Sequence, residues 1–300
     1  MSIGLNIAGP FLGLGAAVFL ALGILFIRKA TANDDPFHGV FISSLIGALI
    51  YLPLALLIYY PDYNLTFASV GSFVAAGGLG LFLGRAFYYH GAEKIGASWT
   101  APIKNSSLLV SSVIGLTLLG ETASTENIIG IMLITIGVAT LGYKIGSENS
   151  EDETGWESYS ALLLPIGAML FIGLSDPLIK VGLNGQTPIL VGLAIMHIPG
   201  FAIVGMYLRK KGESILYPFR AEQKNSYMLG GITLSIGLGI LFAGLEIGKV
   251  VFIVPLKSTS PLFVLIFSYL FFRDLENITR EVVIAAAIIV MGAIMIGISP

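Results

Sequence analysis

The sequence contains no cysteine and carries little charge. The absence of cysteine excludes disulfides, thiolate metal sites and thiol nucleophiles. Only 11% of the 300 residues are charged, whereas ordinary soluble domains carry roughly 25%. The longest basic cluster is Arg209-Lys210-Lys211 and the formal net charge is -2, so the composition argues against a nucleic-acid binder.

Apolar residues make up 55% of the chain, and its mean hydropathy is +0.89. A chain with so little charge cannot cover its surface with polar groups, so we expect its solvent to be lipid. Its start, MSIGLNIAGP, has no basic region and predicts no separable signal peptide. A membrane-crossing helix needs about 20 mostly apolar residues. The apolar runs predict ten such spans, at 10–28, 38–60, 67–90, 97–119, 126–143, 160–181, 186–208, 227–247, 250–272 and 281–299.

The character of these runs predicts the fold class. They are continuously apolar and lack the alternation of lipid-facing strands, which favours helices over a barrel. Short polar breaks separate them, such as Pro61-Asp62-Tyr63-Asn64 and the stretch from Gly91 to Gly96. We therefore expect an all-α, multi-pass protein of the cell membrane, with lipid around it.

The longest polar break lies at the midpoint of the chain. Residues 146–158, GSENSEDETGWES, contain five acids and no base. Such a charged stretch is typical of a solvated tether. The sequence thus predicts an acidic linker between two halves, residues 1–145 and 159–300.

The two halves align with each other. A shift of 153 places the segment PIKNSS, beginning at Pro102, on PLKSTS, beginning at Pro255. The same shift places Glu93 on Glu246 and Glu121 on Asp274. Because each half has five predicted spans, an odd number, the second copy must be inverted relative to the first. Inverted repeats of this kind are found in secondary transporters, which hold the substrate near the midplane.

The repeated segments resemble a known family. The stretch ASWTAPIKNSSLLVSSVIGLTLLGE, from Ala97 to Glu121, and its counterpart VPLKSTSPLFVLIFSYLFFRD, ending at Asp274, resemble the drug/metabolite transporter superfamily, specifically its EamA-like branch. The second copy departs from the pattern, with Arg273-Asp274 where Gly-Glu is usual. The first span also departs, with Ala21-Leu22-Gly23 in place of a tryptophan-containing signature. The resemblance implies two EamA-like five-helix repeats, 1–145 and 159–300, and transport of a small metabolite.

Ionisable side chains inside membrane spans are costly and usually functional. Lys104 and Lys257 each lie about six residues into a span, roughly 9 Å below its end. One reading is that these lysines snorkel to the interface while nearby serines bond their own helix. The other reading is a cavity with two symmetry-related ammonium groups for an anionic or zwitterionic substrate. In related phosphate carriers a lysine of the corresponding ninth helix holds phosphate, which supports Lys257 by resemblance. The polar residues predicted to line this cavity are Thr100, Asn105, Ser107, Ser258 and Thr259.

Further ionisable groups extend the candidate site. Arg85, with Tyr88 and Tyr89 one turn away, is a substrate contact or a structural ion-pair partner. For proton coupling the candidates are Asp176, which precedes Pro177, and Glu246. The alternative for each acid is an interfacial ion pair, with Lys180 and Lys249 respectively. The two histidines inside or near spans, His90 and His197, fit neutral core histidines better than a proton relay.

Three classes of function remain to be weighed. An intramembrane enzyme needs a metal cluster, paired acids or a nucleophile with its base, and the sequence offers no such set. A channel commonly oligomerises around a shared pore, whereas an internal repeat encloses a pathway within one chain. We therefore expect a secondary transporter, without cofactor or metal, that exports an amino acid or other organic anion and acts as a monomer or weak homodimer. A sugar-phosphate or nucleotide-sugar exchanger is the alternative, and a channel-like protein the third reading.

The orientation in the membrane is predicted in opposite senses by two arguments. Basic residues accumulate in short cytoplasmic loops. The odd-numbered connections between spans contain eleven basic residues, whereas the opposite side contains only Lys180 and Lys249. Charge counting therefore predicts that both termini lie outside, while the family resemblance implies that both lie in the cytoplasm.

Overall fold

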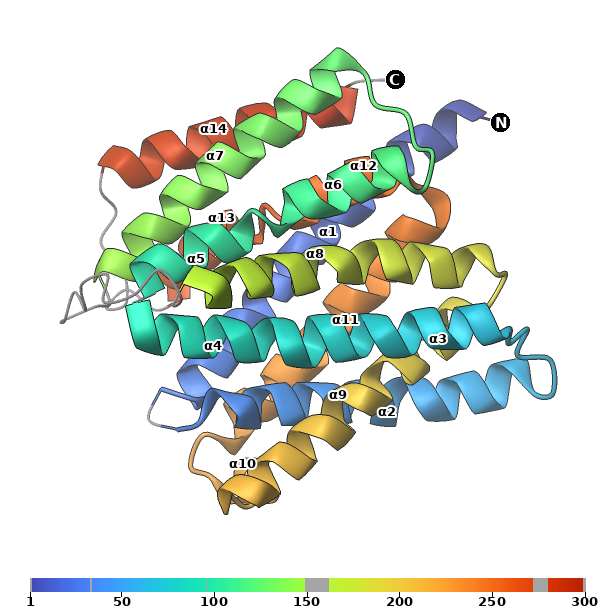
Figure 1. Ribbon diagram of the computed structural model, residues 1–300, viewed down its shortest axis with the longest axis vertical. Helices are drawn as coiled ribbons and strands as arrows, with labels where there is room; N and C mark the ends of the chain where they lie inside the picture. Colours follow the sequence, from blue (N-terminus) through green and yellow to red (C-terminus); the bar gives the residue numbers. More distant parts are fainter. Residues whose placement is uncertain (1, 33, 96, 149–161, 272–279, 299–300) are drawn as a thin grey trace.

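The protein is a helical bundle in the computed structural model, which describes residues 2–32, 34–95, 97–148, 162–271 and 280–298 (Figure 1). All regular structure in these ranges is helical, as predicted. Seven stretches are long and apolar enough to cross a membrane: 8–30, 36–59, 67–92, 163–184, 189–211, 224–247 and 250–270. The all-α, multi-pass membrane fold is thereby confirmed, while the count of ten spans stays a prediction.

The helices follow the predicted spans closely. In the first half they are α1 (Ser2–Ala30), α2 (Pro36–Tyr59), α3 (Phe67–Ala76), the π-helix η1 (Gly77–Leu83), α4 (Gly84–Ile95), α5 (Ala97–Asn105), α6 (Ser107–Thr117) and α7 (Thr125–Glu148). In the second half they are α8 (Leu163–Asn184), α9 (Ile189–Lys211), the short α10 (Tyr217–Arg220), α11 (Lys224–Ile247), α12 (Val250–Lys257), α13 (Ser260–Phe271) and α14 (Arg280–Ile298).

Two of the predicted polar breaks are wrong in detail. The break at 91–96 is helical as far as Ile95, because α4 continues the third span before α5 begins at Ala97. The predicted acidic linker also begins inside a helix, since α7 extends to Glu148. The rest of that linker, 149–158, lies outside the described residues.

The spans predicted at 97–119 and 250–272 are each divided into two helices. The first is interrupted at Ser106, between α5 and α6, and the second at Ser258 and Thr259, between α12 and α13. Pro261 lacks the N–H that would bond the Lys257 carbonyl across the second break. At Ser106 the backbone N–H bonds only three residues back, to Ile103. Serine and threonine hydroxyls compete with helical hydrogen bonds, which favours such interruptions.

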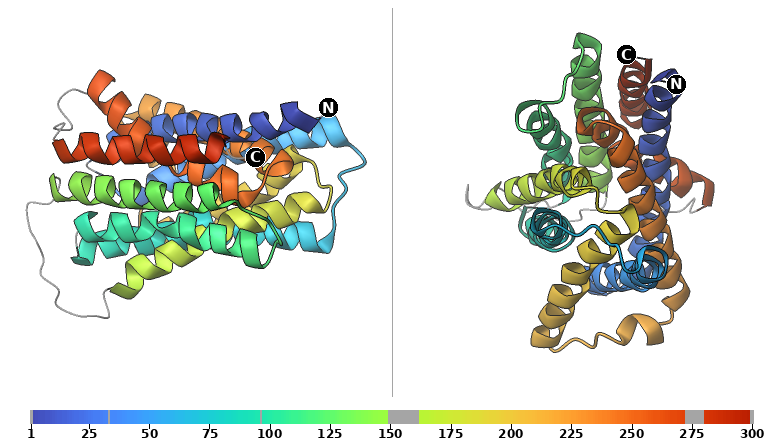
Figure 2. Two further views of the ribbon diagram at one scale, coloured as in Figure 1. Left: turned by 90° about the horizontal axis from the view of Figure 1, so that it is seen from above. Right: turned by 90° about the vertical axis from the view of Figure 1, so that its right-hand side faces the viewer.

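Helices of the two halves pack in the pairs that a two-fold relation requires. The second span packs on the seventh (α2 on α9) and the fifth on the tenth (α7 on α14). The first span packs on the eighth (α1 on α11), and correspondingly the sixth packs on the third (α8 on α3–η1–α4). The N-terminal end of α1 and the C-terminal end of α14 lie on the same side of the bundle (Figure 2). This is the arrangement of an inverted repeat.

The Leu-Gly-Glu turn of the first repeat joins the two halves at one end of the bundle. Gly120 has φ +65°, a left-handed conformation that suits glycine. The turn brings Glu121 to the start of α12, where its carboxylate accepts hydrogen bonds from the backbone N–H groups of Val250 (2.8 Å) and Val251 (3.0 Å). A carboxylate at a helix N-terminus is stabilising. The motif therefore caps a helix of the other half.

Candidate functional site

A cavity of about 660 Å³ lies among helices of both halves. Small-molecule sites typically have volumes of about 300 to 1,000 Å³. Its walls are largely apolar and include Leu20 and Ile24 of α1 and Leu234, Leu238 and Leu241 of α11. The cavity thus offers a largely apolar chamber in which a few polar groups fix what binds.

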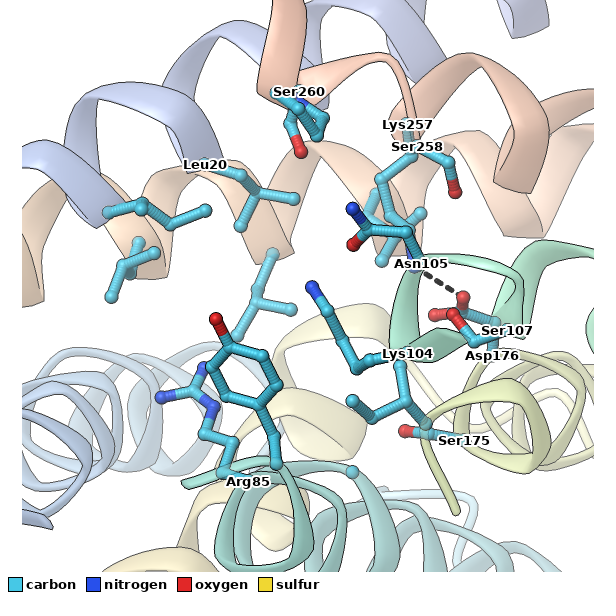
Figure 3. A pocket seen from close by; sticks show the side chains of 18 of the residues that line it. Leu20, Arg85, Lys104, Asn105, Ser107, Ser175, Asp176, Lys257, Ser258 and Ser260 are labelled. Carbon is cyan, nitrogen blue, oxygen red and sulfur yellow. Dashed lines mark hydrogen bonds and ion pairs between the residues drawn. The ribbon is translucent and has the colours of Figure 1, made fainter. Parts of the chain in front are cut away.

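Among the residues that the structure describes, four basic side chains and one acid line this chamber. Arg28 comes from α1, Arg85 from α4, Lys104 from α5 and Lys257 from α12, while Asp176 of α8 is the acid. In Figure 3 the side chains of Arg85 and Lys104 point toward a common space. The excess of positive charge in an apolar chamber favours an anionic ligand, because electrostatic attraction is strong where water is scarce.

Lys104 lies at the end of a half-helix in the middle of the bundle. Its Nζ is 5.3 Å from the centroid of the Tyr88 ring, within the range of a cation–π contact. It occupies the last turn of α5, as Lys257 ends α12. A helix C-terminus carries partial negative charge, which stabilises a nearby ammonium group. Neither lysine escapes the bundle interior by snorkelling, since both line the cavity.

The interrupted helices bring polar groups to the same place. Asn105 and Ser107 flank the break between α5 and α6, and Ser258 and Ser260 lie at the break between α12 and α13. The N-termini of α6 and α13 therefore begin at the cavity wall. Half-helices that end at midplane are typical of substrate sites in transporters.

Lys257 forms an ion pair with Asp176. The Lys257 Nζ donates to Oδ2 of Asp176, and the dashed line in Figure 3 marks this contact. The side chain of Asp176 is 7% exposed and that of Lys257 17%. Lys257 is thus the more accessible partner, and the carboxylate lies deeper in the wall.

Pro177 shapes α8 beside this pair. A proline inside a helix cannot donate to the carbonyl four residues earlier, here that of Gly173. The Ser111 hydroxyl of α6 donates to this carbonyl instead, at 2.7 Å. Buried backbone groups that lose a helical partner need such a replacement in a membrane protein. Ser111 therefore fixes α8 against α6 one turn before Asp176.

The π-helical turn η1 is a further irregularity at the cavity. Ser175 of α8 donates to the Ala76 carbonyl at 3.0 Å, where α3 passes into η1. A Cβ on Gly80 would lie 2.5 Å from the Ser175 Oγ, so the two helices approach closely. Single π-helical turns occur frequently at functional sites.

Comparison with known protein families identifies the family of this chain. Residues 7–143 and 159–298 each match the EamA-like transporter family. The chain belongs to this family. It is a membrane transporter in the drug/metabolite transporter superfamily, and a small molecule is its substrate.

Two other proteins are similar to this chain, one in sequence and one in fold. A stretch of 130 residues, 43% of the transporter, is 26% identical to an uncharacterised protein of Methanocaldococcus jannaschii and covers 93% of that protein. A crystal structure of another protein superposes with a TM-score of 0.77 at 16% identity, over 96% of this chain and 95% of that chain. The similarity to the crystal structure shows that the two proteins share a fold.

Four of the residues predicted for the site lie elsewhere in the transporter. Tyr89 lies outside the cavity wall and packs edge-on against Phe37, with ring centroids 5.4 Å apart. Thr100 is fully buried outside the cavity wall, and Thr259 bonds the Leu256 carbonyl at 2.7 Å. Glu246 is exposed at the end of α11.

The two ion pairs considered as alternatives to proton coupling, Asp176 with Lys180 and Glu246 with Lys249, do not form. Asp176 pairs with Lys257 instead of Lys180, whose Nζ donates to the carbonyls of Leu245 (2.6 Å) and Gly248 (2.8 Å). Lys249 donates to Thr122, with Nζ 2.6 Å from Oγ1. Both lysines thus bond polar groups at the end where Glu121 caps α12.

Of the two histidines predicted to lie in the core, His197 does so and His90 does not. His197 is buried and its ring stacks on Tyr51, with centroids 5.9 Å apart. A Cβ on Gly47 would lie 2.3 Å from the His197 ring, so the glycine admits the histidine. His90 is exposed, and its Nδ1 contacts the Ala86 carbonyl at 2.8 Å.

Two polar residues of the cavity wall were not singled out from the sequence: Arg28 and Ser175. In the sequence Arg28 was grouped with the basic residues of the connections between spans, because it stands at the end of an apolar run. Leu20, Ile24 and Arg28 nevertheless repeat every four residues, a spacing that places them on one helix face. That spacing is the signal that could have identified Arg28.

Proposed function

We propose that this EamA-like protein is a secondary transporter that exports a small metabolite anion, such as an amino acid or another organic acid. The observation that carries the proposal is the charge of the cavity, where four basic side chains face one acid. Lys104, Lys257, Arg85 and Arg28 would bind the anionic group, with Tyr88, Asn105, Ser107 and Ser258 as further contacts.

Alternating access would arise from movement of one repeat against the other around this cavity. The repeats correspond to residues 1–145 and 159–300. The interruptions at Ser106 and at Ser258–Thr259 give each repeat a point where half-helices can turn. Because the cavity lies within one chain, a monomer or weak homodimer suffices.

A phosphate ester is the second candidate substrate, of the kind that a sugar-phosphate or nucleotide-sugar exchanger carries. The same four cations favour it, since phosphate carries up to two negative charges and binds arginine through paired hydrogen bonds. A binding screen with both ligand types separates the two.

The proposal is tested by thermal-shift measurements on purified protein with L-glutamate, succinate, glucose 6-phosphate and L-alanine. We expect one of the three anionic probes to raise the melting temperature of the wild type. Lys257→Met should abolish that shift, because the anion loses its ammonium partner. Lys210→Met removes an exposed charge that does not line the cavity and should behave as the wild type.

The Lys257→Met change leaves Asp176 without its ion-pair partner, which destabilises the fold. The double variant Lys257→Met/Asp176→Asn removes both charges and serves as the folded reference. Undiminished shifts in both variants contradict the proposal, whereas a shift with L-alanine alone contradicts the net negative charge of the substrate.

A further inference from the structure

Asp176 is the one carboxylate among the described residues that line the cavity. Its Oδ2 accepts a hydrogen bond from Lys257, which is the more exposed member of the pair. An anion that enters the cavity therefore meets Lys257 on its open side, while Asp176 competes for the same ammonium group from behind.

The competition has an electrostatic consequence. Two carboxylates that share one ammonium group repel each other, and such pairs are relieved when one of them takes up a proton. In the empty cavity the Asp176 carboxylate offsets one of four positive charges. If the bound anion takes over that position and Asp176 is protonated, the total charge of the cavity is the same before and after binding.

The mechanical setting favours separation of the pair. Asp176 lies on the part of α8 that Ser111 fixes to α6 through the Gly173 carbonyl. Lys257 ends the half-helix α12, next to the interruption at Ser258–Thr259. A shift of α12 against α8 therefore changes the distance between the two charges without breaking a helix.

Other charged groups lie around Asp176 in the same chamber. They are Lys104 of α5, Arg85 of α4 and Arg28 of α1. Tyr88 of α4 is the titratable neighbour without charge at neutral pH. A bound anion neutralises part of the positive charge of these side chains, and it also draws Lys257 away from Asp176.

We propose that Asp176 is the proton carrier of this transporter, and that each anion which displaces it from Lys257 crosses the membrane together with a proton. The proposal rests on the proposed function. In the loading step the carboxylate of the substrate forms an ion pair with the Lys257 ammonium group, and the freed Asp176 carboxylate takes a proton from water in the cavity. On release the anion leaves Lys257, the Asp176 proton returns to water, and the pair forms again.

The first test measures proton movement in liposomes that enclose a pH-sensitive dye. Radiolabelled L-glutamate, succinate and glucose 6-phosphate are each offered outside, and the ratio of protons to anions is recorded. For the wild type we expect about one proton per anion in the same direction, because one carboxylate is titrated in each cycle. For Asp176→Asn we expect a ratio near zero, whatever the rate of anion flux, whereas Asp176→Glu should keep the ratio. Asp62→Asn, at an exposed loop position, is the matched control.

The outcomes separate the inference from the proposed function. Anion flux without proton movement in the wild type, or a ratio in Asp176→Asn equal to that of the wild type, overturns the proton-carrier role and leaves the transporter. Absence of saturable flux for all three probes contradicts the proposed function instead.

A second measurement needs no substrate. Infrared difference spectra at neutral pH report the carbonyl stretch of a protonated carboxylic acid. We expect this band in Lys257→Met, where Asp176 has lost its ammonium partner, but neither in the wild type nor in Lys257→Met/Asp176→Asn. A Lys257→Met spectrum identical to that of the double variant overturns the inference even if no probe is transported.

Discussion

At the scale of single residues, burial and charge identify the candidate site. Lysines and an arginine inside apolar runs stood out in the sequence because the membrane interior penalises unpaired charge. The structure brings Lys104, Lys257, Arg85 and Asp176 together in one chamber. What the sequence could not reveal was the pairing of Asp176 with Lys257, since the partners are 81 residues apart. Their contact depends on how α8 and α12 pack.

Arg28 provides a test at this scale, because its neighbour in sequence is a matched control. Arg28 lines the cavity, whereas Lys29 is exposed. We expect Arg28→Met to weaken binding of the anionic probe at least about tenfold, since a hydrogen bond to a charged group contributes about 1.5 to 3 kcal/mol. Lys29→Met should leave the affinity unchanged. Calorimetric titration of the two variants measures this, and equal affinities would remove Arg28 from the site.

Two adjacent serines of α6 test the role of Pro177. Ser111 donates to the Gly173 carbonyl, whereas the buried Ser112 hydroxyl has no hydrogen-bond partner within the described part of the chain. Ser111→Ala should lower the free energy of unfolding by about 1 to 3 kcal/mol, because a buried carbonyl is left unsatisfied. Ser112→Ala should be neutral or slightly stabilising. Unfolding in detergent by chemical denaturant compares the two, and similar losses in both would contradict this reading.

At the scale of helices, the lengths of the apolar runs predict where the helices lie but not where they are interrupted. Most of the observed helices begin and end within a few residues of the predicted spans, because lipid sets the length of each run. The exception is α1, which begins eight residues before its predicted span. The interruptions at Ser106 and Ser258–Thr259 were missed, as was the π-helical turn η1. Their signals are one or two hydroxyl side chains, a nearby proline and several glycines, which average hydrophobicity does not detect. These irregularities are stabilised by contacts with other helices, which a single span does not encode.

Neighbouring glycines of η1 test how closely that turn packs. A Cβ on Gly77 would lie 2.1 Å from the Met196 carbonyl oxygen of α9, whereas a Cβ on Gly78 would have nothing within 4 Å. Gly77→Ala should therefore destabilise the protein by about 1 to 3 kcal/mol, as overpacked interiors do. Gly78→Ala should stabilise it by up to about 1 kcal/mol, the difference in helix propensity. Melting temperatures of the two variants measure this, and a stable Gly77→Ala protein would show that η1 can move away from α9.

At the scale of the whole molecule, the two ends of the bundle differ. The cavity is lined by Arg28 in the last turn of α1 and by Tyr88 of α4, so it extends toward the ends joined by the odd-numbered connections. At the opposite end Glu121 and Lys249 bond backbone groups across the two halves, and Lys180 bonds backbone carbonyls within the second half. The charge count predicts that the odd-numbered connections are cytoplasmic, and the cavity then extends toward the cytoplasm, as loading for export requires.

The absence of native cysteine makes this orientation measurable. Single cysteines are introduced at two exposed positions, Arg209→Cys at the odd-numbered side and Asp62→Cys at the other. In intact cells a membrane-impermeant maleimide should label Asp62→Cys, while Arg209→Cys should react only after the cells are opened. The reverse pattern would mean that the termini are cytoplasmic and that the charge argument fails.

The central claim, that the chain carries a small anion by alternating access, is tested most directly by counterflow in liposomes. Purified protein is reconstituted with unlabelled L-glutamate, succinate or glucose 6-phosphate inside, and the same labelled compound is supplied outside. We predict, for at least one of these anions, uptake that saturates with outside concentration, depends on the unlabelled anion inside and is lost in Lys257→Met. Uptake that rises linearly with concentration and ignores the inside content, for every one of the three, would contradict the account.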